Sequence, residues 1–399
     1  MRNRQSVKFN TLRFLDRKLG IPLCNFFYLL KKSFFLHGRH RFDRSRVKKI
    51  LVIKIWGMGS IVLASPVFQN LRDNYPEAEI WFLTKEGMEN IYPSRFFDRI
   101  ITIKLRGLFS EVIRFFSLVA GFRREKFDLV IDLEIVSRYS ALVSYLCGAK
   151  TKVGFEIAGL NKDRLYDFKS VYHESKHISQ IFLGTLDVLG FAPKSYAPFA
   201  PEFSPEDEIG LRAIMAGRGI SDDYVIININ ASELALERRL PQASFRDIIA
   251  DIVAEFPGIS VVLAGSKQES CYVSQFNRTH LSGLKNIHDL SGQLKMGELF
   301  ALIKSAKLVV SNDSGPAHVA AAFRTPLVVF FGPETPVIYR PLGEEVSVFY
   351  ADLYCSPCIS VYKDKKINCT NDNRCLKALN TKEISSQISK YLGRNRAAV

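Results

Sequence analysis

Apolar, β-branched runs alternate with helix-spaced segments along most of the chain, and this alternation restricts the fold more than any other feature. Residues 49–55 form a run dominated by Ile, Leu and Val, as expected for a parallel strand that is covered on both faces. A glycine-containing turn follows, and then a helix-spaced segment over residues 61–74. Strands that alternate with helices need right-handed crossovers, so the pattern predicts an α/β fold with doubly wound parallel sheets.

The pattern occurs twice, once on each side of a Pro-rich stretch that has no periodicity. In the first half, further strands are predicted at 78–83, 99–103, 127–133 and 151–154, with helices at 108–122 and 137–147. In the second half, strands are predicted at 224–229, 259–264, 308–311 and 326–331, with helices at 206–218, 243–256, 269–282, 297–305 and 316–323. We therefore expect a leader over 1–47, an N-terminal Rossmann-like domain over 48–190, a linker over 191–205 and a C-terminal Rossmann-like domain over 206–399.

Such sheets bind ligands at the carboxyl ends of their strands. This directs attention to the loops after residues 55, 133, 229, 264, 311 and 331, and we expect a cleft between the two halves.

The leader carries most of the net charge. Residues 1–49 contain 14 Lys and Arg against two acidic residues, so they supply +12 of the formal +15, whereas residues 50–399 carry 41 against 38. The apolar run Phe26–Leu30 is far shorter than the ~20 residues that span a bilayer, and a secretory signal peptide is not expected. A nucleic-acid partner is disfavoured because the body behind the leader has almost no basic excess.

We predict that the leader lies on an anionic membrane surface. Its Phe, Leu and Tyr side chains would enter the headgroup boundary. The cations expected to meet anionic lipid are Lys31, Lys32, Arg39, Arg41 and Arg44. The alternative is a solvated basic tail with one packed helix.

Four of the seven cysteines are close together in the sequence. Cys355, Cys358, Cys369 and Cys375 have the spacing C-x2-C-x10-C-x5-C, which is compatible with a structural zinc ion. Without a signal peptide a reducing compartment is expected, so disulfides are disfavoured. The alternative is four reduced thiols in a basic loop.

The segment 309–322 has the clearest signs of a binding site. A buried strand ends at Asn312, Ser314 is a suitable N-cap, and Pro316 fits the first turn of a helix. Free amides at such a helix N-terminus suit an anion such as a diphosphate, and His318 can add a donor. Asp313 would repel a phosphate, so it is expected to accept hydrogen bonds from sugar hydroxyls or loop amides. The alternative is an ordinary capped helix.

Two further segments of the second half carry charged candidates. Arg238 and Arg239 follow the strand at 224–229 and could clamp phosphates, although a solvated charge pair is the commoner situation. Glu269 could bind a ribose diol, or it could be a first-turn acid that is stabilised by the helix dipole.

Together, Asp313-Ser-Gly-Pro-Ala-His318, Arg238-Arg-Leu-Pro, the Gly57-Met58-Gly59 loop and the Cys-x-x-Cys tail resemble glycosyltransferase family 9. These are the heptosyltransferases of the lipopolysaccharide inner core, and the resemblance spans roughly residues 48–390. It implies a GT-B fold, a nucleotide-sugar donor (typically ADP-heptose) on the C-terminal domain, an acceptor on the N-terminal domain, and inversion without a metal ion. It further implies donor contacts from Asp313, Ser314, Gly315, His318 and Arg238, the last where the family usually has a phosphate-contacting Lys, with Leu294 near the adenine.

One departure concerns the general base. The best-known members have Gly-Asp in the first loop, and that Asp deprotonates the acceptor hydroxyl, whereas here the loop is Gly57-Met58-Gly59-Ser60. A neutral serine is not a base near pH 7. Glu134, at the carboxyl end of the strand at 127–133, is our candidate substitute, with Ser60 as a hydrogen-bond donor. The alternative for Glu134 is a structural role at a strand end.

The preferred hypothesis is an inverting, metal-independent glycosyltransferase with no required cofactor, on the inner face of the cytoplasmic membrane. It would add a heptose or related sugar to a lipopolysaccharide core or other lipid-linked saccharide. The alternative is a non-catalytic protein that binds nucleotide sugars or glycans on a transferase scaffold. An epimerase would need paired acid and base groups in one domain, and the sequence does not indicate such a pair.

Overall fold

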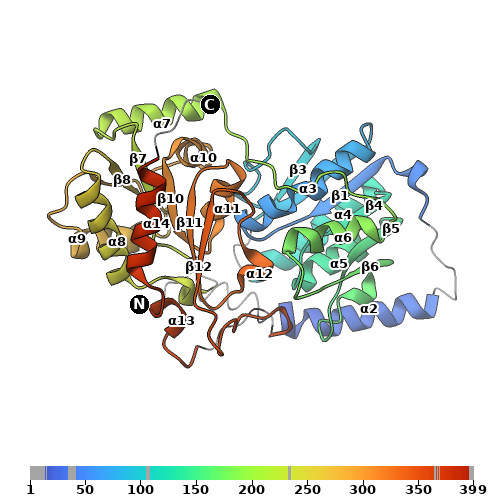
Figure 1. Ribbon diagram of the computed structural model, residues 1–399. Coiled ribbons are helices and arrows are strands. Elements are labelled where there is room, and N and C mark those ends of the chain that lie inside the picture. Colours follow the sequence, from blue (N-terminus) through green and yellow to red (C-terminus); the bar gives the residue numbers. More distant parts are fainter. Residues whose placement is uncertain are drawn as a thin grey trace. The chain divides into compact units, whose positions relative to one another are not determined.

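The computed structural model describes residues 14, 16–34, 42–104, 108–231, 235–363, 365, 367 and 369–394 (Figure 1). The chain divides into two compact units. Unit 1 runs to Pro198 and includes the short segment Val361–Asp364, and unit 2 comprises Phe199–Ser360 and Lys365–Val399. The first division falls inside the Pro-rich stretch.

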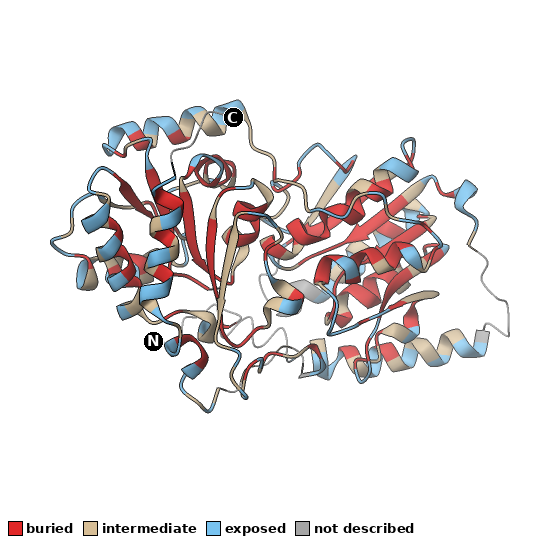
Figure 2. Ribbon diagram, viewed as in Figure 1, coloured by how far each residue is buried: buried red, intermediate tan, exposed pale blue. Residues whose placement is uncertain are grey.

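Unit 1 contains a six-stranded parallel sheet in the order β3-β2-β1-β4-β5-β6. Its strands are β1 (Lys49–Ile53), β2 (Glu79–Lys85), β3 (Arg99–Ile103), β4 (Leu129–Asp132), β5 (Thr151–Glu156) and β6 (Phe168–Val171). The last four residues of β1 are fully buried, because helices cover both faces of the sheet (Figure 2). This burial explains the nearly continuous apolar run in the sequence.

The helices of unit 1 are α2 (Gly20–Phe34), α3 (Met58–Asn74), α4 (Leu108–Glu125), α5 (Arg138–Leu146) and α6 (Ile178–Asp187), with short 3-10 turns η1 (Arg44–Arg46), η2 (Asp163–Leu165) and η4 (Val361–Lys363). α3 packs against α6, whereas α2 and α4 both pack against α5. Helix α3 begins at Met58 rather than at residue 61, so Met58, Gly59 and Ser60 form its first turn. Gly57 makes the preceding turn with a φ of 85°, a conformation that glycine adopts readily.

The described part of the leader packs on unit 1, and two of its cations are used in that packing. Lys31 Nζ donates to Asp167 Oδ1 at 2.9 Å and to the carbonyl of Tyr166 at 3.2 Å. Arg44 donates to the carbonyl of Leu189 and lies 4.1 Å from the centre of the Phe191 ring. The prediction that Lys31 and Arg44 face lipid is therefore wrong, because partners distant in sequence bind them.

Lys32, by contrast, is exposed at the end of α2. Arg39 and Arg41, also predicted to meet lipid, lie outside the described residues. In the described part of the chain, none of the helices combines the length and the apolar character that crossing a bilayer requires.

Unit 2 repeats the architecture with a parallel sheet in the order β12-β11-β10-β7-β8-β9. Its strands are β7 (Tyr224–Asn228), β8 (Ser260–Leu263), β9 (Ile287–Asp289), β10 (Leu308–Asn312), β11 (Leu327–Phe331) and β12 (Val346–Tyr350). Its helices are α7 (Pro205–Gly217), α8 (Gln242–Glu255), α9 (Ser270–His280), α10 (Met296–Ser305), α11 (Gly315–Ala322), α12 (Pro336–Tyr339), α13 (Arg374–Lys377) and α14 (Thr381–Leu392), with the 3-10 turn η3 (Leu236–Arg238).

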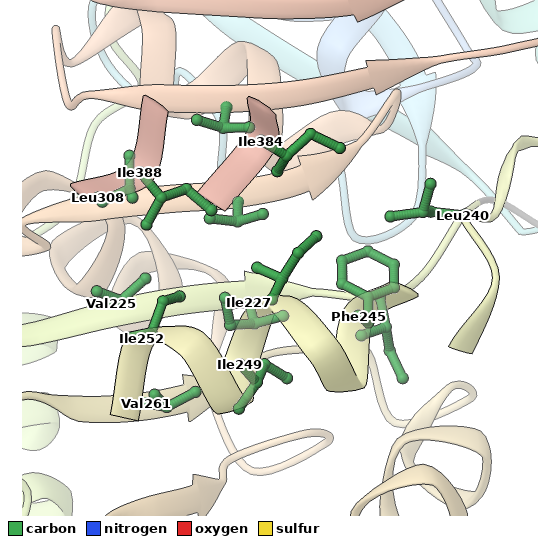
Figure 3. Close-up of a cluster of buried hydrophobic side chains, with 14 of the residues drawn as sticks. Val225, Ile227, Leu240, Phe245, Ile249, Ile252, Val261, Leu308, Ile384 and Ile388 are labelled. Carbon is green, nitrogen blue, oxygen red and sulfur yellow. The ribbon is translucent and has the colours of Figure 1, made fainter. Parts of the chain in front are cut away.

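A cluster of buried hydrophobic side chains covers one face of this sheet (Figure 3). Side chains of α8 and α14 pack there against residues from β7, β8, β10 and β11. The labelled members include Val225, Ile227, Val261 and Leu308 from the sheet, Phe245, Ile249 and Ile252 from α8, and Ile384 and Ile388 from α14. The predicted fold of two doubly wound parallel sheets is thus confirmed.

Both sheets have one topological switch point. In unit 1 it lies between β1 and β4, because β2 and β3 lie on one side of this pair and β5 and β6 on the other. In unit 2 it lies between β7 and β10, with β8 and β9 on one side and β11 and β12 on the other. The loops that follow the two central strands diverge and leave room for a ligand at the carboxyl edge. The fold therefore points to the loops after β1 and β4 in unit 1, and after β7 and β10 in unit 2.

The close contact between Gly154 in β5 and the ring of Tyr166 allows a first test of the packing described for unit 1. A methyl group at this position would lie 2.3 Å from the ring of Tyr166, whose hydroxyl donates to Asp132 and which cannot move without losing that bond. We expect Gly154→Ala to lower the free energy of unfolding by about 1–3 kcal/mol, as overpacking does. Thermal unfolding measures the change.

Gly121 in α4 provides the matched control, since a methyl group there meets no atom of the described structure within 4 Å. Gly121→Ala should leave stability unchanged or raise it by up to about 1 kcal/mol, because alanine favours helix. Equal melting temperatures for the two variants would contradict the packing described for β5.

Candidate functional site

In unit 2, the switch point brings the ends of β7 and β10 together through buried polar side chains. Asn228, the last residue of β7, donates from Nδ2 to Ser311 Oγ at 2.9 Å and to Ser314 Oγ at 2.8 Å. Asn312 Oδ1 accepts the backbone N–H of Leu240 at 2.8 Å. These bonds fix the loop after β7 against the loop after β10.

Helix α11 begins immediately behind this network. Ser314 occupies the N-cap position and Pro316 lies in the first turn, as predicted. However, the Ser314 side chain makes no capping hydrogen bond within the described residues, because its hydroxyl is turned toward Asn228 and Ser311. The N-terminus of α11 therefore lacks a side-chain cap, and its positive dipole end remains suited to an anion.

Asp313 and Arg238 form the charged centre of the site. Arg238 Nη1 donates to Asp313 Oδ2 at 3.1 Å, and the Asp313 side chain is almost completely buried. His318 Nε2 lies 3.9 Å from the other carboxylate oxygen, Oδ1. The positive charge of the Arg238 guanidinium offsets the negative charge of the Asp313 carboxylate. The pair as a whole therefore does not repel an anion bound at the N-terminus of α11. Asp313, Ser314, Gly315, His318 and Arg238 are thus brought together.

The two neighbouring arginines have different surroundings. The Arg239 guanidinium lies 4.0 Å from the centre of the Tyr272 ring, so it stacks within unit 2 rather than facing Asp313. In the described structure, the buried polar atoms without a hydrogen-bond partner include Nε of both arginines and Asn230 Oδ1. Buried polar groups are normally paired. These unpaired atoms mark the loop after β7 as a candidate ligand site, although they are enclosed in this structure.

Glu334 is a site residue that the sequence analysis did not single out. It follows β11, the neighbour of β10, and it is only 6% exposed. Its Oε2 lies 3.8 Å from Lys365 Nζ. The pKa of Glu334 is raised to about 7, mainly by burial. The negative charge of Asp313 also raises this pKa, whereas the positive charges of Lys365 and Arg238 lower it. The sequence analysis predicted that the loop after residue 331 faces a ligand. The glutamate at position 334, three residues beyond that strand, could have been identified as a candidate on this ground.

Glu269 and Leu294 lie after β8 and β9, along the same carboxyl edge. Glu269 Oε2 accepts from the backbone N–H of Ser266 at 2.9 Å and from its hydroxyl at 2.7 Å, so this oxygen closes its own turn. Leu294 is half-buried in the segment before α10. Their assignment to the ribose and adenine of a nucleotide stays a prediction.

In unit 1, Glu134 connects the loops after β4 and β1. Its Oε1 accepts from Lys54 Nζ at 2.8 Å, from the backbone N–H of Ile55 at 2.6 Å and from that of Trp56 at 2.9 Å. The Glu134 side chain is buried. The loop residues that it binds, Ile55 and Trp56, come directly before Gly57. Glu134 thus holds the loop that the sequence analysis had selected, and it lies at the switch point as expected.

Asp132 makes a separate, fully buried network. Its carboxylate accepts from the hydroxyls of Tyr166 and Ser140 and from the backbone N–H of Glu134, and Lys162 Nζ lies 3.6 Å away. Burial raises the pKa of Asp132, although each of these contacts stabilises the carboxylate and so lowers the pKa. Because it is enclosed, Asp132 supports the β4 loop rather than meeting a ligand.

The four clustered cysteines lie within electrostatic reach of one another. Burial raises the pKa of Cys358 to about 11, and the thiols of Cys369, Cys375 and Cys355 contribute to the shift. Among the described residues, however, no group of three or more His, Cys, Asp or Glu side chains is arranged to hold a metal ion. The structural zinc ion stays a prediction, and no step below depends on one.

Comparison with known proteins places these features in a family. Residues 115–368 match the model of glycosyltransferase family 9 (heptosyltransferase). The chain is 27% identical over 305 residues to lipopolysaccharide heptosyltransferase 3 of Escherichia coli (strain K12), covering 74% of this chain and 86% of that protein.

Two solved structures are similar in fold. The glycosyl transferase family 9 protein from Veillonella parvula DSM 2008 has a TM-score of 0.70 at 20% identity, covering 87% of this chain and 98% of that one. The E. coli ADP-heptose lps heptosyltransferase II has a TM-score of 0.66 at 19% identity, covering 86% and 98%. The predicted GT-B fold is thereby confirmed.

The raised pKa of Glu334 predicts a pH dependence of stability. The folded protein holds this proton up to about pH 7, whereas an ordinary glutamate loses it near 4.5. Between these values the unfolded chain binds fewer protons, so the contribution of Glu334 to stability falls as the pH rises, by up to about 1.4 kcal/mol per pH unit. We expect Glu334→Gln to remove this fall, measured by urea unfolding from pH 5 to pH 8.

The exposed neighbour Glu344 supplies the control. Glu344→Gln should reproduce the pH profile of the unmodified protein. A Glu334→Gln profile that is parallel to that of the unmodified protein would show that the Glu334 carboxyl ionises as an exposed one does.

Proposed function

The chain belongs to glycosyltransferase family 9, and from this membership we propose that it moves a heptose or related sugar from ADP-heptose to a lipopolysaccharide core or other lipid-linked saccharide. Membership of this family supports a glycosyl-transferring enzyme, and the nucleotide, the sugar and the acceptor are the finer parts of the proposal. The E. coli relatives named above, whose names refer to lipopolysaccharide and ADP-heptose, support this choice of donor and acceptor.

The observation that carries the proposal is the uncapped N-terminus of α11 beside the Arg238–Asp313 pair. The donor diphosphate would lie at the helix N-terminus, where backbone amides and the dipole favour negative charge. Arg238 would bind it through its guanidinium group, whose Nη1 also donates to Asp313. Asp313 and His318 would contact the sugar hydroxyls.

The reaction we propose is a single displacement with inversion. The acceptor hydroxyl attacks the anomeric carbon, the bond from that carbon to the diphosphate oxygen breaks, and ADP leaves with the electron pair. Arg238, His318 and the amides of α11 would stabilise the charge that develops on the leaving diphosphate. These groups supply the positive charge that a metal ion supplies elsewhere, so we propose that the reaction needs neither a metal nor a cofactor.

The acceptor proton needs a base, and we propose Glu134 in unit 1. Three donors bind its Oε1, which leaves Oε2 as the atom that would take the proton. Ser60, in the first turn of α3, would donate a hydrogen bond to the acceptor, and Gly57, Met58 and Gly59 would line the same loop. The same contacts would also suit a purely structural Glu134, so a kinetic test is required.

A second candidate function follows from the loop after β1. The sequence there has Ser60 and no carboxylate, so the chain could bind nucleotide sugars or glycans without transferring the sugar. Under this alternative ADP-heptose binds with no release of ADP, whereas the preferred function requires both.

We also propose a place for the protein in the cell. The basic leader and a lipid-linked, anionic acceptor are compatible with peripheral attachment of residues 1–47 to the inner face of the cytoplasmic membrane. No nucleic-acid partner is proposed.

Release of ADP from ADP-heptose in the presence of heptose-deficient lipopolysaccharide tests the function directly. We expect Arg238→Met to bind ADP between about 10- and 100-fold more weakly, since hydrogen bonds to charged groups contribute about 1.5–3 kcal/mol. Isothermal titration with ADP measures the affinity, and the same sample measures turnover.

Arg239→Met is the control, because the Arg239 guanidinium stacks on Tyr272. It should bind ADP as the unmodified protein does. If both variants bind alike, Arg238 does not hold the diphosphate. If a folded protein binds ADP but turns over no ADP-heptose with any lipopolysaccharide acceptor, the binding alternative is correct.

Replacement of Glu134 by glutamine tests the base. Glutamine keeps an oxygen for the amides of Ile55 and Trp56 but cannot accept the proton. We expect kcat to fall by about 10²–10⁴-fold while the affinity for ADP is unchanged. Glu156→Gln, at the exposed end of the next strand β5, should keep full activity. Retention of kcat in Glu134→Gln would assign the proton transfer to another group.

A further inference from the structure

Helix α2 has apolar side chains on two opposite sides. One side packs on unit 1, where Cys24 is fully buried and the Phe27 ring lies 5.7 Å from that of Tyr145. The other side is exposed: Phe26 and Leu29 each expose more than half of their surface, and Leu23 exposes 42%. Figure 2 shows exposed positions recurring along this helix.

The exposed apolar residues of α2 recur every three or four positions. Leu19, directly before the helix, continues the series Leu23, Phe26 and Leu29, so these side chains form one stripe along the helix. A surface helix ordinarily presents polar residues on the side that faces away from its core. Here the outward stripe is apolar.

Helix α4 has a second exposed apolar group. Val112, Ile113 and Phe116 each expose more than half of their surface. Their neighbour Phe115 points the other way and packs on Tyr139 of α5, with ring centres 5.3 Å apart. The exposed group is therefore the outer side of a docked helix.

The two helices flank α5 on the same face of unit 1. Phe115 from α4 and Phe27 and Tyr28 from α2 pack against one small core that includes Ala141 and Leu142 of α5. The inward sides of both helices thus converge on α5. Their outward sides together form what we call the α2/α4 face, defined by Leu19, Leu23, Phe26, Leu29, Val112, Ile113 and Phe116.

The charges along the two helices are mainly positive, although α4 also contains Glu111 and Glu125. Helix α2 contains no acidic residue, and Lys32 at its end is exposed. Arg114 is exposed between the apolar residues of α4, and Arg123 and Arg124 are in its last turn. Residues 1–49 carry a net charge of +12. The face therefore combines apolar side chains with a basic border.

A bilayer that contains anionic lipid has the complementary chemistry. Its acyl boundary takes up Leu, Phe and Ile, and its phosphates attract Lys and Arg at the headgroup level. Arginine and lysine side chains can keep their charges in the headgroups while their stems cover apolar surface. A nucleic acid would use the cations but leave the apolar stripe in water.

We propose that the α2/α4 face docks unit 1 on an anionic lipid bilayer, with side chains of both helices entering the headgroup boundary. This deepens the membrane attachment proposed for residues 1–47, on which it rests in part, because it assigns half of the contact to a helix outside the leader. It does not depend on the chemistry of sugar transfer.

Co-sedimentation of the full-length protein with vesicles tests the proposal. The vesicles consist of phosphatidylcholine alone or of phosphatidylcholine with phosphatidylglycerol. One variant carries Leu23→Ser, Phe26→Ser and Leu29→Ser, and a second carries Val112→Ser, Ile113→Ser and Phe116→Ser. We expect the unmodified protein to prefer the anionic vesicles and each variant to bind about tenfold or more weakly.

The control removes equally exposed apolar residues from unit 2, through Ile209→Ser in α7 and Val337→Ser in α12. It should bind vesicles as the unmodified protein does. Unchanged melting temperatures show that the triple variants fold, and unchanged ADP-heptose turnover on a detergent-dispersed acceptor keeps this proposal separate from the proposed function.

Three results would overturn the proposal. Normal vesicle binding by the α4 variant would limit the contact to the leader. Normal binding by both variants would exclude the face altogether. Absence of vesicle binding, with a dimer that either variant dissociates, would identify the face as an interface between two copies of the chain.

Discussion

In both units, a buried side chain at the end of one strand accepts backbone N–H groups from the loop that follows a neighbouring strand. Glu134 accepts those of Ile55 and Trp56, and Asn312 accepts that of Leu240. A loop at the open edge of a sheet has few backbone partners of its own, so such contacts decide its conformation. The positions of these loops then determine which side chains can reach a ligand at the switch point.

The two units meet this requirement with different charges. In unit 1 the holding group is a carboxylate, and Lys54 balances it at 2.8 Å. In unit 2 the holding group is the neutral amide of Asn312, so the charged side chains nearby do not serve the scaffold alone. Arg238 offsets Asp313, and the raised pKa of Glu334 reduces its negative charge near neutral pH. Both effects lessen the repulsion that a diphosphate would meet there.

The sequence was sufficient for the central parts of the fold, because short, β-branched apolar runs that end at a glycine turn, such as that of β1, are typical of buried strands. It was insufficient for β9, whose three residues are all half-buried, and for β12, whose five residues are half-buried at the edge of its sheet. Such strands have no long apolar run. Glu334 was missed for another reason: its proximity to Asp313 arises from the sheet order, in which β11 lies beside β10.

Contacts between residues distant in sequence also explain why the prediction that Lys31 and Arg44 face lipid was wrong. Lys31 looks like part of a basic tail in the sequence, but its partner Asp167 is 136 residues away. The same pairing decides how the leader can act. Once Lys31 and Cys24 fix one side of α2 on unit 1, the side chains on its other side must face outward. A packed helix and a membrane-facing helix were alternatives in the sequence analysis. The structure shows the packed helix, and the packing leaves the stripe of Leu23, Phe26 and Leu29 exposed, as the proposed membrane contact requires.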